Sequence, residues 1–153
     1  MAGSGKAHLR PEDETLIRVE DLVVEYPIPG GDTVKAVSGI SFDIKPGETL
    51  GLVGESGCGK STTGKALIQL PKPSSGSVKH NLVELTDLSS EAMRRRRTDL
   101  QMIFQDPISS LNPLRKVEDI VAEPMKIWGP RDKSKQKEMV DNILESVGID
   151  PEQ

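Results

Sequence analysis

One nine-residue stretch, from Gly54 to Thr62, has the residue types and the spacing of a phosphate-binding loop. It reads Gly-Glu-Ser-Gly-Cys-Gly-Lys-Ser-Thr and matches G-x-x-x-x-G-K-[ST], the P-loop or Walker A pattern. Its glycines permit backbone angles that wrap successive N–H groups around an anion, and a following helix adds its positive end. The pattern predicts that this loop binds the phosphates of a nucleotide.

Two side chains of the loop have predicted chemical tasks. Lys60 reaches the β- and γ-phosphates as a mobile point charge, and the Ser61 hydroxyl is placed to bind Mg²⁺. Cys58 is the single cysteine, and we interpret it as a small residue that the loop tolerates. The residues predicted to contact the nucleotide are Gly54, Ser56, Gly57, Cys58, Gly59, Lys60, Ser61 and Thr62.

The bulk composition narrows the class of protein. The chain has 153 residues, which is the size of one domain, and a net charge of −4, which argues against a general polyanion binder. No apolar run approaches the roughly 18 residues of a membrane span, and the polar N-terminus does not resemble a secretory signal. A lone cysteine favours a reducing compartment.

Secondary structure is predicted on both sides of the loop. Residues 49–53 form an apolar run of strand type, and residues 62–70 read as a helix that Pro71 ends. Upstream, extended patterns at residues 16–26, 33–37 and 40–44 predict an antiparallel β lead-in, and residues 1–14 predict a mobile tail. Tyr26 ends the first strand, where an aromatic ring either packs or stacks on a nucleobase.

The second half of the chain is predicted to become helical. Residues 77–79 start a short strand, with His80 in the turn after it, and Ser89 or Ser90 caps a helix to Arg97. We interpret the arginine run 94–97 as a solvated helix face on which two or three arginines pair with Glu91, Asp99 or neighbouring residues.

Three further elements are predicted after the arginine run. Residues 100–104 predict a buried strand, and residues 117–123 a helix stopped near Pro124. Asp132 or Ser134 caps a last helix, which Gly148 ends. Its apolar face holds Met139, Val140, Ile143, Leu144 and Val147.

From about Leu16 to Gln153 the chain resembles an ATP-binding-cassette ATPase. More narrowly, it resembles ATP-binding subunits of bacterial oligopeptide and dipeptide importers, a group that also serves nickel and glutathione. The resemblance is carried by residues 23–26, 54–62 and 102–107, by the continuation 110–113, and by residues 123–124. It implies that Tyr26 stacks on adenine, and that Gln105 is the Q-loop glutamine, which contacts Mg²⁺ and couples the site to membrane subunits.

The resemblance also implies a fold and a domain organisation. The expected fold is an α/β P-loop NTPase with an antiparallel β lead-in, its core at residues 15–113, and a helical subdomain that starts at residues 114–153. The sequence contains no signature motif, Walker B strand, dimer loop or switch histidine. We therefore expect the N-terminal part of a nucleotide-binding domain, stopping within its helical subdomain, with unpaired apolar edges. By itself it would bind MgATP weakly and hydrolyse it negligibly.

The implied cofactors are ATP and Mg²⁺, and the implied role is coupling ATP binding and hydrolysis to import. Expected partners are transmembrane permease subunits through the Q-loop region, a second nucleotide-binding domain, and a solute-binding protein indirectly, with no nucleic acid. The expected location is cytoplasmic, on the inner face of the cell membrane. Two alternatives stay open, a non-transport ATPase of DNA repair or translation and a non-catalytic nucleotide-binding fragment.

Overall fold

The computed structural model describes residues 9–107 and 109–150. It divides into two compact units, one ending at Met102 and the other beginning at Ile103. This division falls earlier than the one at residue 113 that separates the predicted core from the predicted helical part. Within the described residues, every helix is too short or too polar to cross a membrane.

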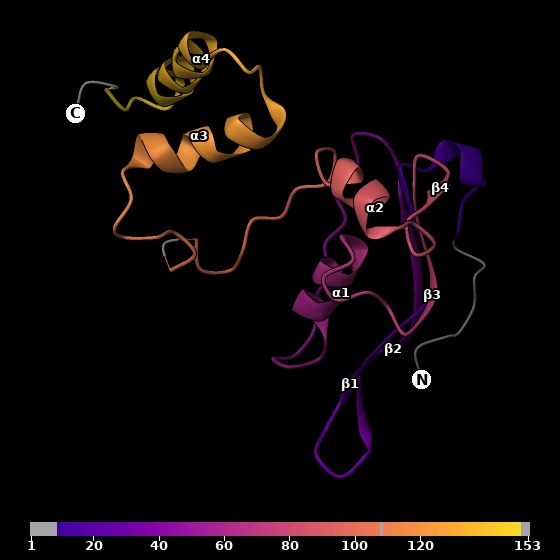
Figure 1. Cartoon of the computed structure of the whole chain (residues 1–153). Helices are drawn as coiled ribbons and strands as arrows, with labels where there is room; N and C mark the ends of the chain where they lie inside the picture. The colour runs from indigo at the N-terminus through magenta and orange to yellow at the C-terminus, as the bar shows by residue number, and fades with distance from the viewer. Residues whose placement is uncertain (1–8, 108, 151–153) are drawn as a thin grey trace. The chain divides into compact units, whose positions relative to one another are not determined.

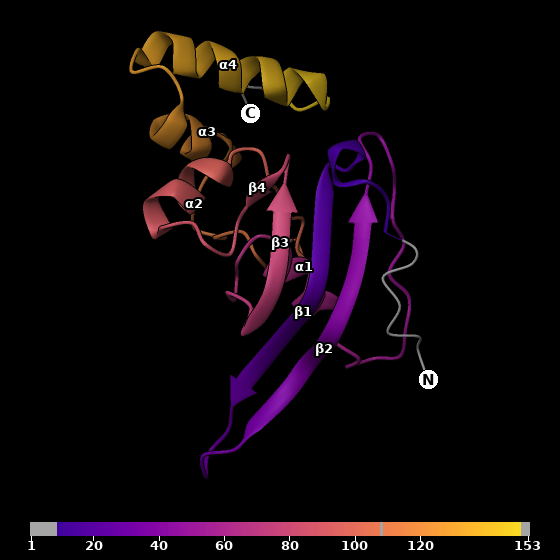
Figure 2. The ribbon, with the colours of Figure 1, turned by 90° about the vertical axis from the view of Figure 1, so that its right-hand side faces the viewer.

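A four-stranded antiparallel sheet organises the first unit, in the order β2-β1-β3-β4 (Figures 1 and 2). Its members are β1 (Ile17–Pro27), β2 (Thr33–Ile44), β3 (Ser75–His80) and β4 (Val83–Glu84). β1 pairs with β2 along its whole length but with β3 only as far as Val23. The β1–β2 hairpin therefore extends beyond β3 (Figure 2). The predicted antiparallel β lead-in is confirmed. The two extended segments predicted at residues 33–37 and 40–44 form a single strand, β2.

A bulge in β1 explains why one face of the strand is buried along its length although apolar and polar residues do not alternate strictly in its sequence. Ile17 and Val19 face the core, the register with β2 shifts after Val19, and Leu22 and Val24 then return to the core. Asp21 takes the extra position with φ +49°. The core of this unit is formed by Ile17, Val19, Leu22, Val24, Val37, Ala66, Val78, Leu85 and Met93.

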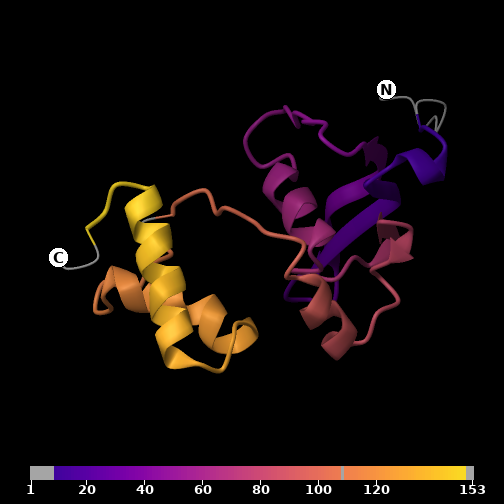
Figure 3. The same ribbon diagram turned by 90° about the horizontal axis from the view of Figure 1, so that it is seen from above.

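The helix predicted after the loop is present as α1 (Lys60–Leu67). It contacts β1 and β2, and Ala66 and Thr63 are its buried residues. Figure 3 shows the segment after β2 leaving the sheet and returning to α1. The loop of residues 54–59 thus connects the segment that leaves the sheet to a helix that packs on the sheet.

Two predicted strands are wrong. Residues 49–53 and 100–104 have no strand assignment, and Val53 is 94% and Ile103 89% exposed. A strand needs a hydrogen-bonded neighbour, and neither run pairs with a strand among the described residues. Apolar character alone therefore did not make these two segments strands.

Local capping signals are confirmed. Helix α2 (Ser90–Arg96) begins after Ser89, whose hydroxyl accepts from the Ala92 amide at 3.3 Å. The predicted turn residue His80 is instead the last residue of β3 and is buried, because it continues the core-facing alternation after Val78.

The second unit contains two helices, α3 (Val117–Trp128) and α4 (Lys133–Ser146), which pack against each other. Asp132 caps α4, accepting from the Ser134 amide at 2.9 Å. On the predicted apolar face of α4, Val140 and Leu144 are buried, whereas Met139, Ile143 and Val147 are exposed.

The prediction that α3 stops near Pro124 is wrong. The proline removes one backbone donor from the helix, yet the helix continues to Trp128 and ends at Gly129. Packing against α4 supports this last turn, since the Gln136 side chain donates to the Met125 carbonyl at 3.2 Å. The contact between α3 and α4 therefore outweighs the tendency of Pro124 to end the helix.

Candidate nucleotide-binding site

Two glycines of the predicted P-loop need the backbone freedom that only glycine has. Gly57 and Gly59 have φ angles of +81° and +94°. Gly59 also lies against β2, where an added Cβ would stand 2.2 Å from the Ala36 carbonyl oxygen. Within the loop the Cys58 amide donates to the Glu55 carbonyl at 3.3 Å. These glycines thus allow the loop to turn tightly and to pass close to the sheet.

The loop leads directly into the N-terminus of α1. Gly59 is the N-cap and contributes no side chain. The first backbone bond of the helix runs from the Thr63 amide to the Gly59 carbonyl at 2.8 Å. A helix leaves its first amides without intrahelical acceptors, so those of Lys60, Ser61 and Thr62 are available to an anion.

Lys60 is folded over the loop that precedes it. Its Nζ donates to the Gly54 carbonyl at 2.8 Å and to the Glu55 carbonyl at 2.5 Å, and lies 3.5 Å from Cys58 Sγ. The structure thus brings the Lys60 ammonium together with Gly54 and Glu55 at the start of the predicted cradle and with Cys58. Its two oxygen acceptors are neutral backbone carbonyls.

A cavity of about 430 Å³ lies beside the loop. It is lined by Gly57 and Cys58 and by residues of β2, namely Val34, Lys35, Ala36, Val37, Ser38 and Ile40. Sequence reasoning missed these β2 residues, because their types are those of an ordinary strand. It also missed Thr63, whose buried hydroxyl donates to the Gly59 carbonyl at 3.0 Å.

Tyr26 lies in β1, directly opposite Val34 of β2. Its side chain is 38% exposed, and its partner Val34 lines the cavity beside the loop. Tyr26 is not itself among the lining residues. It therefore neighbours the cavity through Val34, and its contact with adenine stays a prediction.

Of the two predicted metal ligands, Ser61 is exposed in the first turn of α1. Gln105 is exposed in the second unit, in a bend before a turn. That turn is closed by the hydroxyl of Ser110, which donates to the Asp106 carbonyl at 2.8 Å. The structure places Ser61 with the loop, and the role of Gln105 stays a prediction.

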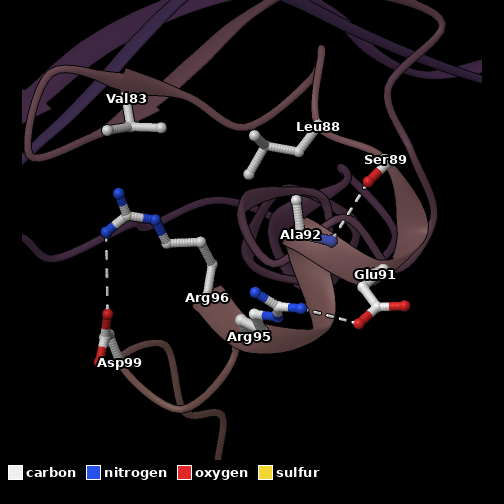
Figure 4. A pocket seen from close by; sticks show the side chains of 8 residues that line it. All are labelled: Val83, Leu88, Ser89, Glu91, Ala92, Arg95, Arg96 and Asp99. Atoms are coloured by element: carbon white, nitrogen blue, oxygen red, sulfur yellow. Dashed lines mark hydrogen bonds and ion pairs between the residues drawn. The ribbon is translucent and has the colours of Figure 1, made fainter.

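A larger hollow of about 640 Å³ lies over α2, but its chemistry differs (Figure 4). Its arginines are paired with carboxylates, Arg95 with Glu91 at 2.9 Å and Arg96 with Asp99 at 3.9 Å. Both pairings agree with the interpretation of the arginine run as a solvated helix face. The cavity beside the P-loop is therefore the better candidate for a nucleotide.

Comparison with known proteins identifies the family of the chain. Residues 37–153 match the model of the family described as ABC transporter. The oligopeptide transport ATP-binding protein AppF of Bacillus subtilis (strain 168) is 41% identical over 145 residues, covering 90% of this chain and 44% of that protein. The di/tripeptide transport ATP-binding protein DppF of Pseudomonas aeruginosa (strain UCBPP-PA14) is 40% identical over 144 residues, covering 91% and 45%.

A solved dimer of a bacterial ABC transporter cassette has a similar fold. It superposes with a TM-score of 0.71 at 27% identity, and the match covers 84% of this chain and 54% of that one. The expected fold, an ABC-type cassette with an antiparallel β lead-in, is thereby confirmed. The chain spans less than half the length of these two transport ATP-binding proteins. On its sequence, its P-loop geometry and its fold, the chain belongs to the ABC transporter family.

Proposed function

We propose that this chain forms the P-loop part of the ATP-binding subunit of an importer for peptides or related small solutes. One observation carries the proposal. A turn with left-handed glycines at 57 and 59 leads into the free amides of α1, beside a cavity lined by β2. This arrangement suits a nucleoside triphosphate, since it offers amides and a lysine to phosphates and a concave strand surface to the nucleoside.

The proposed roles follow the position of each residue. The backbone from Ser56 to Thr62 and the Lys60 ammonium hold the phosphates. Tyr26, which lies in the β1–β2 hairpin, holds the adenine. Ser61 and Gln105 are the proposed Mg²⁺ ligands, and the exposed hydroxyl at the start of α1 fits a hard cation that prefers oxygen. Bound Mg²⁺ would neutralise charge on the phosphate oxygens.

In the whole protein, we propose that MgATP binding and hydrolysis drive transport. The partners would be permease subunits, reached through the region of Gln105, and a second nucleotide-binding domain, with a solute-binding protein acting indirectly. The site would then lie on the cytoplasmic face of the membrane. The names of the two similar peptide transport ATP-binding proteins support a role in transport over one in DNA repair or translation. For residues 1–153 alone we expect nucleotide binding without turnover.

Titration calorimetry of MgATP into the 153-residue chain tests the proposal. The parent should bind, and Lys60→Ala should lose most of the affinity because the γ- and β-phosphates lose their only side-chain cation in the loop. Lys65→Ala is the matched control, since Lys65 is an exposed lysine in the last turn of the same helix. Equal binding by Lys60→Ala and Lys65→Ala would contradict the proposed site.

Transport is tested separately in the whole protein. Co-purification with integral membrane subunits is the expected result. Recovery with ribosomes or DNA instead would favour the non-transport alternative.

A further inference from the structure

Arg10 connects the segment before β1 to the turn that follows β2. Its guanidinium makes a two-bond ion pair with Glu48, with N···O distances of 2.6 and 2.7 Å. Its backbone amide donates to the buried carboxylate of Asp43 at 2.7 Å, and its carbonyl accepts from Arg18 at 2.7 Å. Arg10 is thus fixed through its backbone before its side chain reaches Glu48.

Glu48 in turn closes the turn of residues 45–48. Its carboxylate accepts from the Lys45 amide at 2.7 Å, and its own amide donates to the Lys45 carbonyl at 3.1 Å. A carboxylate that accepts from a backbone amide and from a forked guanidinium is held in one geometry. The Arg10–Glu48 pair therefore fixes this turn to the sheet.

The segment after the turn has little else to hold it. Within the part of the chain that the structure describes, residues 49–54 make no backbone–backbone hydrogen bond. Leu50, Leu52 and Val53 are all exposed. The next fixed position is Gly54, whose carbonyl accepts from Lys60 Nζ at 2.8 Å, and the loop is fixed again at Gly59, which lies against Ala36. The segment of residues 49–53 that leads into the P-loop is consequently suspended between two attachments, one at Glu48 and one at Gly54.

We propose that Arg10 is a positioning residue for the P-loop, which sets nucleotide affinity by holding Glu48 at the start of the segment that leads into Gly54. This inference rests on the proposed function. The physical reason is conformational entropy, because a loop that is already fixed at both ends loses less freedom when a ligand orders it. If the attachment at Glu48 is released, the entropy cost of ordering the loop is subtracted from the free energy of nucleotide binding.

The test is calorimetric titration of MgATP into variants of the full 153-residue chain. Arg10→Ala and Glu48→Gln should each raise the Kd about fivefold, and the double variant should raise it no further, because the pair acts as one unit. Arg10→Lys should rescue part of the affinity, since lysine restores the charge without the forked contact.

The matched control is Lys79→Ala. Lys79 of β3 pairs with Glu12, which lies in the same N-terminal segment as Arg10. This variant therefore removes an ion pair of that segment that does not involve the turn of residues 45–48. Its Kd should equal that of the parent even where its melting temperature falls. An unchanged Kd in Arg10→Ala, or an equal rise in Lys79→Ala, would overturn the inference.

A measurement without nucleotide separates this inference from the proposed function. ¹⁵N relaxation of the nucleotide-free chain should give lower order parameters for residues 49–53 in Arg10→Ala than in the parent or in Lys79→Ala. Equal order parameters would overturn the inference. A parent that fails to bind MgATP would contradict the proposed function, and the relaxation data would still decide the role of Arg10.

Discussion

Gly59 of the P-loop lies so close to Ala36 of β2 that a Cβ on the glycine would stand 2.2 Å from the Ala36 carbonyl oxygen. Such a distance is far below a van der Waals contact, and the obstacle is backbone that cannot rotate away. The same glycine has φ +94° and caps α1. One residue thus fixes the loop to the sheet and starts the helix whose first amides are available to an anion.

Gly59→Ala should abolish MgATP binding, because the added methyl group must push the loop away from β2. We also expect a loss of about 1–3 kcal/mol in the free energy of unfolding from the strained φ alone. Gly39→Ala is the control, since Gly39 has φ +72° but no atom within 4 Å of an added Cβ. It should lose stability and keep the Kd. Unchanged binding by Gly59→Ala, measured by calorimetry, would refute the close approach.

Tyr26→Ala should weaken MgATP binding by about tenfold, because stacking of a base on an aromatic ring contributes about 1–3 kcal/mol. Tyr26→Phe keeps the ring and should bind like the parent. The proximity of Tyr26 to the cavity through Val34 motivates both variants. If Tyr26→Ala binds as well as Tyr26→Phe in calorimetry, the ring has a packing role only.

The Arg10–Glu48 pair predicts an acid-dependent loss of stability. The guanidinium of Arg10, and then the Lys45 amide, lower the pKa of Glu48 from 4.5 to about 2. A lowered folded-state pKa stabilises the fold above the unfolded pKa, and this contribution disappears as the pH falls from about 4.5 towards 2.

Urea unfolding of the parent and of Glu48→Gln at a series of pH values measures this effect. The difference in the free energy of unfolding should be largest above pH 5 and should vanish near pH 2. A difference that does not change with pH would show that the carboxylate has no special partner.

His80 should tolerate an apolar replacement. It is buried in β3 with 5% exposure; its Nε2 lies 3.5 Å from Asn81 Nδ2, and its Nδ1 has no hydrogen-bond partner within the residues that the structure describes. A hydrocarbon of similar size removes the desolvation penalty of the unsatisfied Nδ1 and offsets the loss of the long contact with Asn81, so His80→Leu should change the free energy of unfolding by less than about 1 kcal/mol. Val78→Ala, on the same face of β3, should cost about 2 kcal/mol. A loss in His80→Leu as large as that in Val78→Ala would show that the imidazole has a buried partner.

Features that depend on neighbours in the sequence were determined by the sequence itself. The P-loop glycines, the helix after them, and the caps Ser89 and Asp132 all follow from backbone geometry and hydrogen bonds within a few residues. The alternation of residues 16–26 likewise predicted β1, because a side-chain period of two is a local property.

Tertiary structure decided what depends on distant partners. Residues 49–53 and 100–104 are apolar but have no strand beside them among the described residues, since pairing is supplied by other segments and not by propensity. Helix α3 passes through Pro124 because α4 supports its last turn. The cavity lining on β2, the contact of Gly59 with Ala36 and the ion pair of Arg10 with Glu48 join residues 17 to 38 positions apart. No local pattern encodes such contacts, because they exist only once the sheet has formed.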